Sequence, residues 1–354
     1  MIRSASWPAK PGRAALTDKP GPAAFLLAVS GQVLLARALG VAAQLRIADL
    51  LSDGPKDAAQ LGRASGSDAP ALYRILRLLA SHEVFAEDES GRFRLTPRAE
   101  LLREDLPGSL HSLFSAGWQD PAWAAFAELP AAVRNGEVAF ELAHGSSFFD
   151  YLAAHPRSGN AFDRAMALVA AAENPVIAAS FDFSRFTQVA DIGGGQGGLL
   201  AAILARHPGV RGLLYDQPQV VADPAELRDA GSLDRCDIQA GDFFERVPAG
   251  VDLYLLKRIL HDWDDATATR ILRRCREAMP ADGRIAVVDA VMLPGNAPDP
   301  NKATDVSIMA LTPGRERSRP EFEQLFAAAG LRLVAVHALP LPATLSIIEA
   351  CAAG

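Results

Sequence analysis

The feature that most constrains this chain is a glycine-rich turn between two short apolar segments. Residues 189–192 are apolar except for Asp191 and are followed by G-G-G-Q-G-G at 193–198. Residues 199–206 have helical composition, and a second apolar segment, 213–215, leads to Asp216. This order predicts a strand–helix–strand unit of a parallel α/β sheet with an acid at the tip of its second strand. Glycines in the first turn let the backbone approach a ligand closely.

Taken alone, this unit is compatible with more than one ligand. Gly193, Gly195 and Gly198 match the G-x-G-x-x-G pattern of dinucleotide-binding proteins, and Asp216 follows after about 20 residues, as a ribose-binding acid does. A nicotinamide or flavin cofactor fits this pattern, and so does S-adenosylmethionine. A structural turn without a ligand is the third alternative. The ends of the other strands have to discriminate between them.

The predicted strand ends are mostly acidic. Ligands of open α/β sheets lie beyond the carboxyl ends of the strands, and here those ends are Asp191, Asp216, Asp242, Lys257 and Asp289. The glycine turn has no Lys or Arg to bind a pyrophosphate. S-adenosylmethionine has no phosphate, but it has a sulfonium cation, an ammonium group and a ribose diol. The acidic edge therefore favours S-adenosylmethionine over a dinucleotide.

Individual strand-end residues match parts of this cofactor. Asp216 is expected to accept hydrogen bonds from both ribose hydroxyls, and Asp242 from the adenine amino group. Phe243 and Trp263 are expected to lie against the faces of the adenine ring, and Lys257 to meet the cofactor carboxylate. Each acid also has a simpler interpretation as a capping or turn residue.

His261 is the candidate general base. It lies four residues after the strand end at Lys257 and directly precedes Asp262. A phenol has a pKa of about 10, so a neutral imidazole within hydrogen-bond reach can take its proton as the oxygen attacks a methyl group. Asp289 and Glu316 are expected to reach the other ring nitrogen, which would fix the tautomer.

The N-terminal region has the pattern of a winged helix. Residues 25–51 are apolar and predict two helices that are covered by a core or by another chain. Two amphipathic helices at 57–64 and 69–82 and a hairpin at 84–95 follow. A winged helix often binds DNA, but the acidic wing at 87–89 would repel phosphate. A dimerisation module is therefore the preferred interpretation.

The middle region is predicted to be helical, with helices at 118–135 and 161–179. Phe162, Met166 and Val169 fall on one face of the second helix. By default these three side chains belong to a core. They line a substrate pocket only if the helix lies over the carboxyl edge of the sheet.

The last two apolar segments complete the predicted sheet. Residues 331–337 and 345–351 are separated by a short loop, so they must pair as an antiparallel hairpin. The expected fold is an α/β fold with a seven-stranded, mostly parallel Rossmann-like sheet and one antiparallel pair at its edge.

Composition is that of an ordinary globular protein in a reducing cytoplasm. The 354 residues carry a net charge of −7, which attracts neither nucleic acid nor an anionic membrane. The three cysteines are scattered without metal-ligand or disulfide spacing. We expect no apolar run of transmembrane length, no signal peptide, and a disordered tail at 1–20.

Taken together, the motifs resemble the S-adenosylmethionine-dependent O-methyltransferases of the caffeate and hydroxyindole type. The motifs are, in order, D-I-G-G-G-Q-G, Y-D-Q-P, G-D-F-F, L-L-K-R-I-L-H-D-W-D-D and G-R-E-R-S. The resemblance extends from about Phe25 to Ala350 and is nearest to bacterial members that methylate aromatic polyketides and related secondary metabolites. It implies a homodimer with a winged-helix dimerisation domain at 21–105, a helical linker and substrate-covering region at 106–180, and a cofactor-binding catalytic domain at 181–354.

The resemblance and the strand ends together predict the site. The catalytic set is His261 with the acids Asp262, Asp289 and Glu316. The residues expected to bind S-adenosylmethionine are Asp191, Gly193, Gly195, Asp216, Gln217, Gly241, Asp242, Phe243, Lys257, Arg258 and Trp263. The residues expected near a flat, apolar acceptor with a phenolic hydroxyl are Trp118, Phe162, Met166, Ile308 and Met309.

Two residues depart from the family pattern. Asp289 stands where such enzymes more often carry Glu, and Pro313 replaces a glycine before the G-R-E-R segment. Relatives on this fold also perform hydroxylation, decarboxylation or pericyclic reactions with the cofactor retained, so the fold alone does not decide the reaction. A DNA-binding regulator is the remaining alternative.

Overall fold

The computed structural model describes residues 21–106 and 108–354, so the tail predicted at 1–20 lies outside the described residues. The chain divides into two compact units, one ending at Phe114 and one beginning at Ser115. Each unit has a hydrophobic core of its own.

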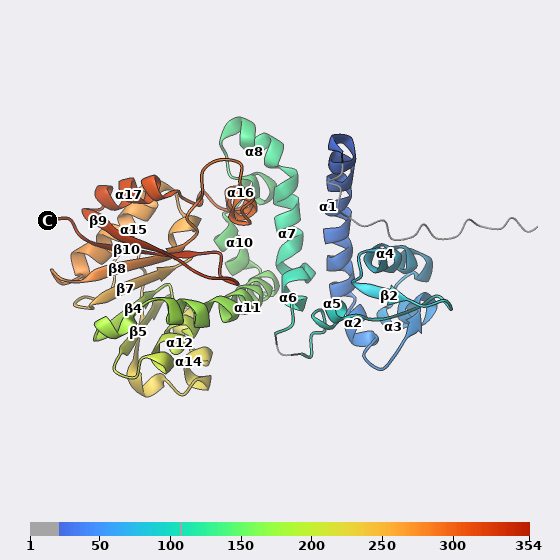
Figure 1. Ribbon diagram of the computed structural model, residues 1–354, viewed down its shortest axis with the longest axis horizontal. Coiled ribbons are helices and arrows are strands. Elements are labelled where there is room, and N and C mark those ends of the chain that lie inside the picture. The colour runs from blue at the N-terminus through green and yellow to red at the C-terminus, as the bar shows by residue number, and fades with distance from the viewer. Residues whose placement is uncertain (1–20, 107) are drawn as a thin grey trace, which may run out of the picture. The chain divides into compact units, whose positions relative to one another are not determined.

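The N-terminal unit combines a long helix with two short amphipathic helices and a small sheet (Figure 1). Side-chain caps explain where the amphipathic helices begin, because Asp57 forms a capping box with Gln60 and Asp68 accepts a hydrogen bond from the Ala71 N–H. A strand that the sequence pattern does not predict, β1, pairs with the hairpin in the order β1-β3-β2. The elements are α1 (Pro22–Gln44), α2 (Ile47–Leu50), β1 (Lys56–Asp57), α3 (Ala58–Ser65), α4 (Ala69–Ser81), β2 (Phe85–Glu87), β3 (Arg92–Leu95), α5 (Pro97–Glu100) and α6 (His111–Phe114).

Helix α1 has an unusual surface. By length and composition alone it is long and apolar enough to cross a membrane, so the expectation that no apolar run reaches that length is wrong. It packs on the core of its own unit from Leu35 onward, and its first fully buried residue is Ala38. The preceding turns expose the apolar side chains of Phe25, Leu26, Leu27, Val29, Val33 and Leu34.

The C-terminal unit is built on the predicted seven-stranded sheet. Its strand order is β6-β5-β4-β7-β8-β10-β9, and β10 is antiparallel to both neighbours. The structure thus confirms the predicted hairpin at the edge. The strands are β4 (Gln188–Ile192), β5 (Arg211–Asp216), β6 (Cys236–Ala240), β7 (Leu253–Lys257), β8 (Arg284–Asp289), β9 (Leu331–Ala338) and β10 (Ser346–Ala352).

Helices cover both faces of this sheet (Figure 1). Both faces are apolar because successive side chains of a strand point to opposite faces. Val189 belongs to a buried cluster with α12 and the end of α11, and Ala190 belongs to a second cluster with α15 and α17. The covering helices are α11 (Pro156–Ser180), α12 (Gly198–Arg206), α13 (Pro218–Val221), α14 (Ala225–Asp229), α15 (Asp265–Ala278) and α17 (Arg319–Ala328).

Further helices pack on this unit from the middle region and from 301–311. The single helix predicted at 118–135 is two, because α7 (Ala116–Ala127) ends at Glu128 and α8 (Leu129–Asn135) begins with a proline in its first turn. Helix α16 (Asn301–Leu311) lies where the sequence pattern predicts no element. The remaining two are α9 (Ala139–His144) and α10 (Phe148–Ala154).

Candidate active site

The candidate base lies on a short turn after β7. His261 is buried in the 3₁₀ turn Leu260–Asp262 (η3). Its Nδ1 lies 3.0 Å from Glu316 Oε1, whereas its Nε2 lies 3.7 Å from Asp262 Oδ1, beyond hydrogen-bond distance. A carboxylate accepts but does not donate, so the neutral ring carries its proton on Nδ1. The lone pair on Nε2 is then free to receive a proton from the hydroxyl group of a methyl acceptor.

The surrounding acids make this histidine a strong base. Burial lowers the pKa of His261, but the charge of Asp262, the hydrogen bond to Glu316 and the charge of Asp289 outweigh it and raise the pKa to about 9. That value is close to the pKa of about 10 of a phenol. Proton transfer from a phenolic hydroxyl to Nε2 is therefore nearly balanced in free energy.

Asp289 acts on the ring at longer range. Its side chain is only 1% exposed, and neither carboxylate oxygen has a hydrogen-bond partner among the described residues. The expected contact between Asp289 and the imidazole is therefore absent, which agrees with the shorter reach of Asp compared with Glu. Burial raises the pKa of Asp289 to about 7, although the charge of His261 opposes the shift.

Glu316 reaches the ring from the segment between α16 and α17. Its backbone N–H donates to Asp305 Oδ1 at 2.8 Å, which ties this segment to α16. Two residues earlier, the Gly314 backbone packs on the base turn so closely that a Cβ there would lie 1.9 Å from the His261 carbonyl oxygen. A glycine is therefore required at this position for steric reasons. Nothing in the structure explains the substitution at Pro313.

The glycine turn after β4 has one open position. A Cβ at Gly194 would meet Leu214 and Asp191, and one at Gly193 would meet Ile259, but one at Gly195 would meet nothing within 4 Å. Gly195 has a φ of +60°, and its N–H donates to Asp216 Oδ2 at 2.9 Å. The turn is thus fastened to the end of β5 and faces free space at the glycine where a ligand is expected.

The predicted ribose and adenine residues lie next to this turn. Asp216 Oδ1 accepts from the Gln217 N–H at 2.7 Å, so each carboxylate oxygen has one backbone donor and a free lone pair for a ribose hydroxyl. Asp242 is exposed, and its Oδ1 accepts from the Phe244 N–H at 2.8 Å. Position 241 requires a glycine for steric reasons, because a Cβ there would clash with the Tyr215 hydroxyl.

Four aromatic rings form a row that includes Phe243 and Trp263, the two rings predicted to lie against adenine. The rings of Phe243 and Phe244 are 4.7 Å apart, and Phe244 meets Trp263 edge-on at 4.8 Å. Phe149 from α10 stacks on Trp263 at 6.1 Å. The sequence analysis singled out Phe243 and Trp263, but not the two rings that contact Trp263.

A buried acid on α11 also belongs to the site, and sequence reasoning missed it. Glu173 Oε2 lies 3.1 Å from Lys257 Nζ, and its Oε1 lies 2.5 Å from Arg258 Nη2. Lys257 also donates to Asn174 Oδ1 at 2.8 Å. Burial raises the pKa of Glu173, but Arg258 and Lys257 outweigh it and hold that pKa below its usual value. The available signal was the polar pair Glu173 and Asn174 directly after the alanine run at 170–172.

These contacts show that α11 lies over the carboxyl edge of the sheet. They also use the positive charge of Lys257, so any contact with a cofactor carboxylate is shared with Glu173. Arg258 has a φ of +54°, a conformation that is uncommon for non-glycine residues. Its ion pair with Glu173 holds it there.

The predicted acceptor residues are on helices of this same unit. Trp118 on α7 meets Phe162 on α11 edge-on at 6.0 Å, and Phe148 meets Phe162 at 5.2 Å. Met166 is half-buried on α11. On α16, Ile308 is half-buried and Met309 is exposed. Phe162 and Trp118 pack against the buried cluster around Phe140 and Phe148, so they belong at least partly to a core, and their role in a substrate pocket stays a prediction.

Comparison with known proteins gives matches over nearly the whole chain. Residues 126–332 match the family model of the O-methyltransferase domain, and residues 28–105 match that of the O-methyltransferase dimerisation domain. Phenazine O-methyltransferase PhzM of Lysobacter antibioticus is 44% identical over 89% of this chain and 92% of its own length. The 8-amino-8-demethylriboflavin N,N-dimethyltransferase of Streptomyces davaonensis is 36% identical over 83% of this chain and 86% of its own length.

Solved structures give the same result. The crystal structure of LaPhzM superposes with a TM-score of 0.87 at 41% identity, covering 94% of this chain and 100% of that one. The O-methyltransferase NcsB1 from neocarzinostatin biosynthesis, solved with S-adenosylmethionine and 2-hydroxy-5-methyl naphthoic acid, has a TM-score of 0.80 at 33% identity over 90% of this chain and 95% of its own.

Proposed function

This chain belongs to the O-methyltransferase family with an N-terminal dimerisation domain, and we propose that it methylates a phenolic hydroxyl group of an aromatic secondary metabolite. It is a methyltransferase with S-adenosylmethionine as cofactor and S-adenosylhomocysteine as product. The relatives include both O- and N-methyltransferases. The observation that favours a hydroxyl acceptor is the state of His261, since a hydroxyl has to lose its proton during methyl transfer.

The residues present fit the cofactor. Gly195 faces open space beside the carboxylate of Asp216, and the site has carboxylates where a dinucleotide would need phosphate-binding cations. We assign the ribose to Asp216, the adenine to Asp242 and the row of aromatic rings, and the remaining end to Gly195, Asp191 and Lys257. When bound, S-adenosylmethionine supplies an electrophilic methyl group. Gln217, Gly193, Gly241 and Arg258 support these contacts through the turns described above.

His261 performs the proton transfer in this proposal. Glu316 holds Nδ1–H, so that Nε2 receives the proton of the acceptor hydroxyl. The imidazolium that forms is stabilised by Glu316, Asp262 and Asp289. Trp118, Phe162, Met166, Ile308 and Met309 would surround a flat aromatic acceptor, as part of the covering region proposed for 106–180.

Labelled cofactor tests this function. The protein is supplied with methyl-labelled S-adenosylmethionine and a panel of phenols and their amine analogues, and label in the product is followed together with S-adenosylhomocysteine. His261→Ala is expected to lower turnover of the phenol by about 10²–10⁴-fold and to leave S-adenosylhomocysteine affinity nearly unchanged. A neutral amine can attack the methyl group with its lone pair before it loses a proton, so it does not need the base. If His261→Ala methylates an amine analogue as fast as the wild-type protein does, the result would indicate N-methylation. Product that carries no label would refute methyl transfer altogether.

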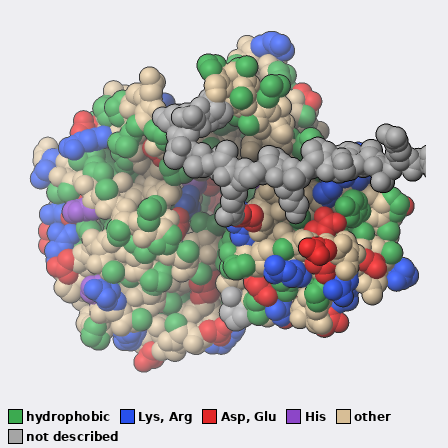
Figure 2. Space-filling view, turned by 45° about the vertical axis from the view of Figure 1, so that its right-hand side comes forward, with side chains coloured by type: hydrophobic (Ala, Val, Ile, Leu, Met, Phe, Trp, Pro, Cys, Tyr) green, Lys and Arg blue, Asp and Glu red, His purple; other side chains and the backbone are tan. Residues whose placement is uncertain are grey.

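For the N-terminal unit we propose dimerisation rather than DNA binding. Arg46, Lys56, Arg92, Arg98 and Arg103 each form ion pairs with acidic residues of the same unit. Figure 2 shows basic and acidic side chains interspersed on the visible face of this unit. On that face the basic side chains do not gather into a patch for phosphate, whereas the exposed apolar residues of α1 suit a second copy of the chain. The three free, buried cysteines suit the reducing cytoplasm proposed as its location.

A further inference from the structure

The residue next to Glu316 is an arginine that is only 1% exposed. Arg317 is among the largest fully buried side chains of the chain. A guanidinium is always charged and presents its donors in a rigid plane, so its burial is tolerated only where acceptors match that plane. The acceptors around Arg317 therefore indicate what the residue is for.

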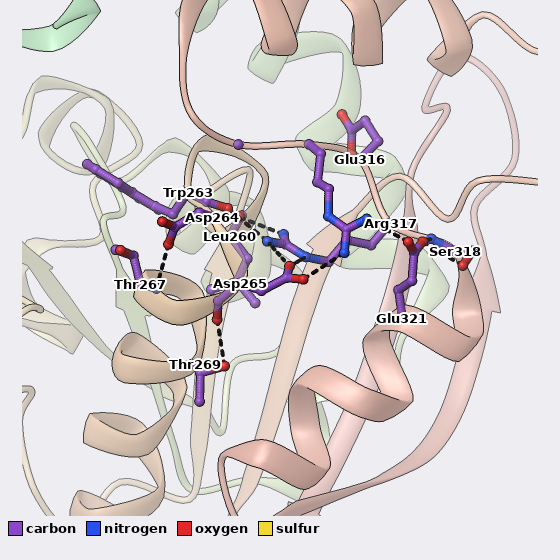
Figure 3. Close-up of polar contacts among 12 residues, drawn as sticks. Leu260, Trp263, Asp264, Asp265, Thr267, Thr269, Glu316, Arg317, Ser318 and Glu321 are labelled. Atoms are coloured by element: carbon purple, nitrogen blue, oxygen red, sulfur yellow. Dashed lines mark hydrogen bonds and ion pairs between the residues drawn. The ribbon is translucent and has the colours of Figure 1, made fainter. Parts of the chain in front are cut away.

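Arg317 holds the backbone on both sides of the base (Figure 3). Its Nη1 donates to the Leu260 carbonyl at 2.8 Å, and its Nη2 donates to the Trp263 carbonyl at 2.8 Å. Leu260 immediately precedes His261, and Trp263 follows it by two residues. One planar group thus spans the turn that carries His261.

The third contact anchors this arginine to the protein frame. Arg317 Nε donates to Asp265 Oδ1 at 2.9 Å, at the first turn of α15. Asp265 is also paired with Arg315 at 2.7 Å, and Arg315 with Glu321, which caps α17, at 2.6 Å. Burial raises the pKa of Asp265, but hydrogen bonds from Arg315 and Arg317 outweigh it and hold that pKa below its usual value. The network in Figure 3 therefore links the base turn to the ends of two helices.

We propose that Arg317 is a positioning residue for the base, which sets the place of the His261 ring through the Leu260 and Trp263 carbonyls while Glu316 sets its orientation. The inference rests on the proposed role of His261. Adjacent residues of one segment hold the backbone and the ring of the same histidine. A shift of the turn would change the distance from Nε2 to an acceptor hydroxyl, and of the residues assigned to the cofactor only Trp263 would move with it, while Asp216 and Asp242 lie outside the turn.

Arg317→Lys tests this role because it keeps the positive charge but loses the planar guanidinium with its several donors. One ammonium group cannot span two carbonyls and the Asp265 carboxylate with the geometry of a guanidinium. A misplacement of about 1 Å costs on the order of 10²-fold in rate, so kcat is expected to fall roughly 10- to 10²-fold. The KM for the acceptor and the affinity for S-adenosylhomocysteine are expected to change by less than about threefold.

A matched control separates positioning from stability. Arg235 also donates to backbone carbonyls, including that of Leu204 at 2.7 Å, but at the end of α12. Arg235→Lys should lower the melting temperature while kcat stays at the wild-type value. If Arg317→Lys does not fold, Asp265→Asn is the alternative, because it removes the charge that anchors Arg317 at a more exposed residue. It should also lower kcat, but to a smaller degree.

Two further measurements decide whether the effect passes through the histidine. Adding Arg317→Lys to His261→Ala should lower kcat by less than about twofold, because groups that act as a unit are not additive. Imidazole ¹⁵N spectra without cofactor, recorded above about pH 9 where the ring is neutral, should show that Arg317→Lys weakens the preference for the Nδ1–H tautomer, because a displaced turn moves Nδ1 away from Glu316. An unchanged spectrum, or a full additional loss in the double mutant, would overturn the proposal. Failure of the proposed function itself would appear differently, as absent methyl transfer or a fully active His261→Ala protein.

Discussion

At the scale of single residues, the chemistry depends on one buried histidine among three carboxyl groups. Only Glu316 contacts the ring by a hydrogen bond, whereas Asp262 and Asp289 act through their charge. The same surroundings stabilise the folded chain while His261 is protonated. Because its pKa is raised to about 9, this stabilisation is complete below the unfolded value of about 6.5 and is lost as the pH rises through about 9.

Glu316→Gln is expected to shift the pH dependence of activity to lower pH. Loss of the carboxylate on Nδ1 removes one cause of the raised pKa of His261, while burial continues to favour the neutral ring. The midpoint of the kcat/KM profile for the acceptor should fall, and the maximal rate should drop by less than in His261→Ala. Glu323→Gln is the matched control, since Glu323 pairs with Arg319 at the surface of α17. A midpoint that stays in place would contradict the assignment of Glu316.

Asp289→Asn is expected to change stability in a pH-dependent way. The raised pKa of Asp289, about 7, means that the folded chain binds the proton more tightly than the unfolded chain, so stability falls as the pH rises from about 4 to about 7. Asn does not ionise and removes this loss. The melting temperature of the variant relative to wild type should therefore be more favourable at about pH 8 than at about pH 4. An equal difference at both pH values would show that Asp289 is not held partly neutral.

At the scale of elements, the site is assembled where segments follow strand or helix ends. The η3 turn follows β7, the glycine turn follows β4, and residues 312–318 connect α16 to α17. Helix α11 closes the edge through Glu173 and its two cationic partners. These segments hold their shape through contacts between side chains and backbone groups. The distances between them therefore change when a substitution adds or removes a single atom at a contact.

Gly314→Ala is expected to displace the base turn. Its Cβ would meet the backbone of His261 and Asp262, which cannot move aside as the end of a flexible side chain can. We expect a lower melting temperature and a kcat reduced by roughly 10-fold or more, with S-adenosylhomocysteine affinity less affected. Gly209→Ala is the control, because a Cβ there meets nothing within 4 Å. Wild-type kcat in Gly314→Ala would show that the turn tolerates movement.

At the scale of the whole molecule, we expect α1 to mediate dimerisation. Its N-terminal half exposes six large apolar side chains, and residues 28–105 match a dimerisation domain. An apolar surface of this kind is stable in water when another surface covers it. The second unit has its own core, and the match to the dimerisation domain and the candidate site lie in separate units of the chain.

Leu27→Asp is expected to weaken the dimer. Leu27 is 74% exposed in the single chain, and a carboxylate there would have to be buried in the interface without a partner. Multi-angle light scattering should give a dimer for wild type and a monomer fraction that grows on dilution for the variant. Leu233→Asp, at an exposed leucine of the second unit, should remain dimeric. A wild-type monomer at micromolar concentration would refute the assembly.

The sequence by itself determined the features that depend on local order. The glycine turn, the acids at the strand ends, the antiparallel hairpin and the position of His261 all follow from neighbouring residues, because strand period, turn residues and caps act over a few positions. The tertiary structure decided which groups meet across long separations. Glu173 lies 85 residues from Arg258, and Glu316 lies 55 residues from His261. Whether Glu316 or Asp289 holds the imidazole depends on the path of a loop and the reach of one methylene, and the buried fork of Arg317 has meaning only beside the carbonyls it holds.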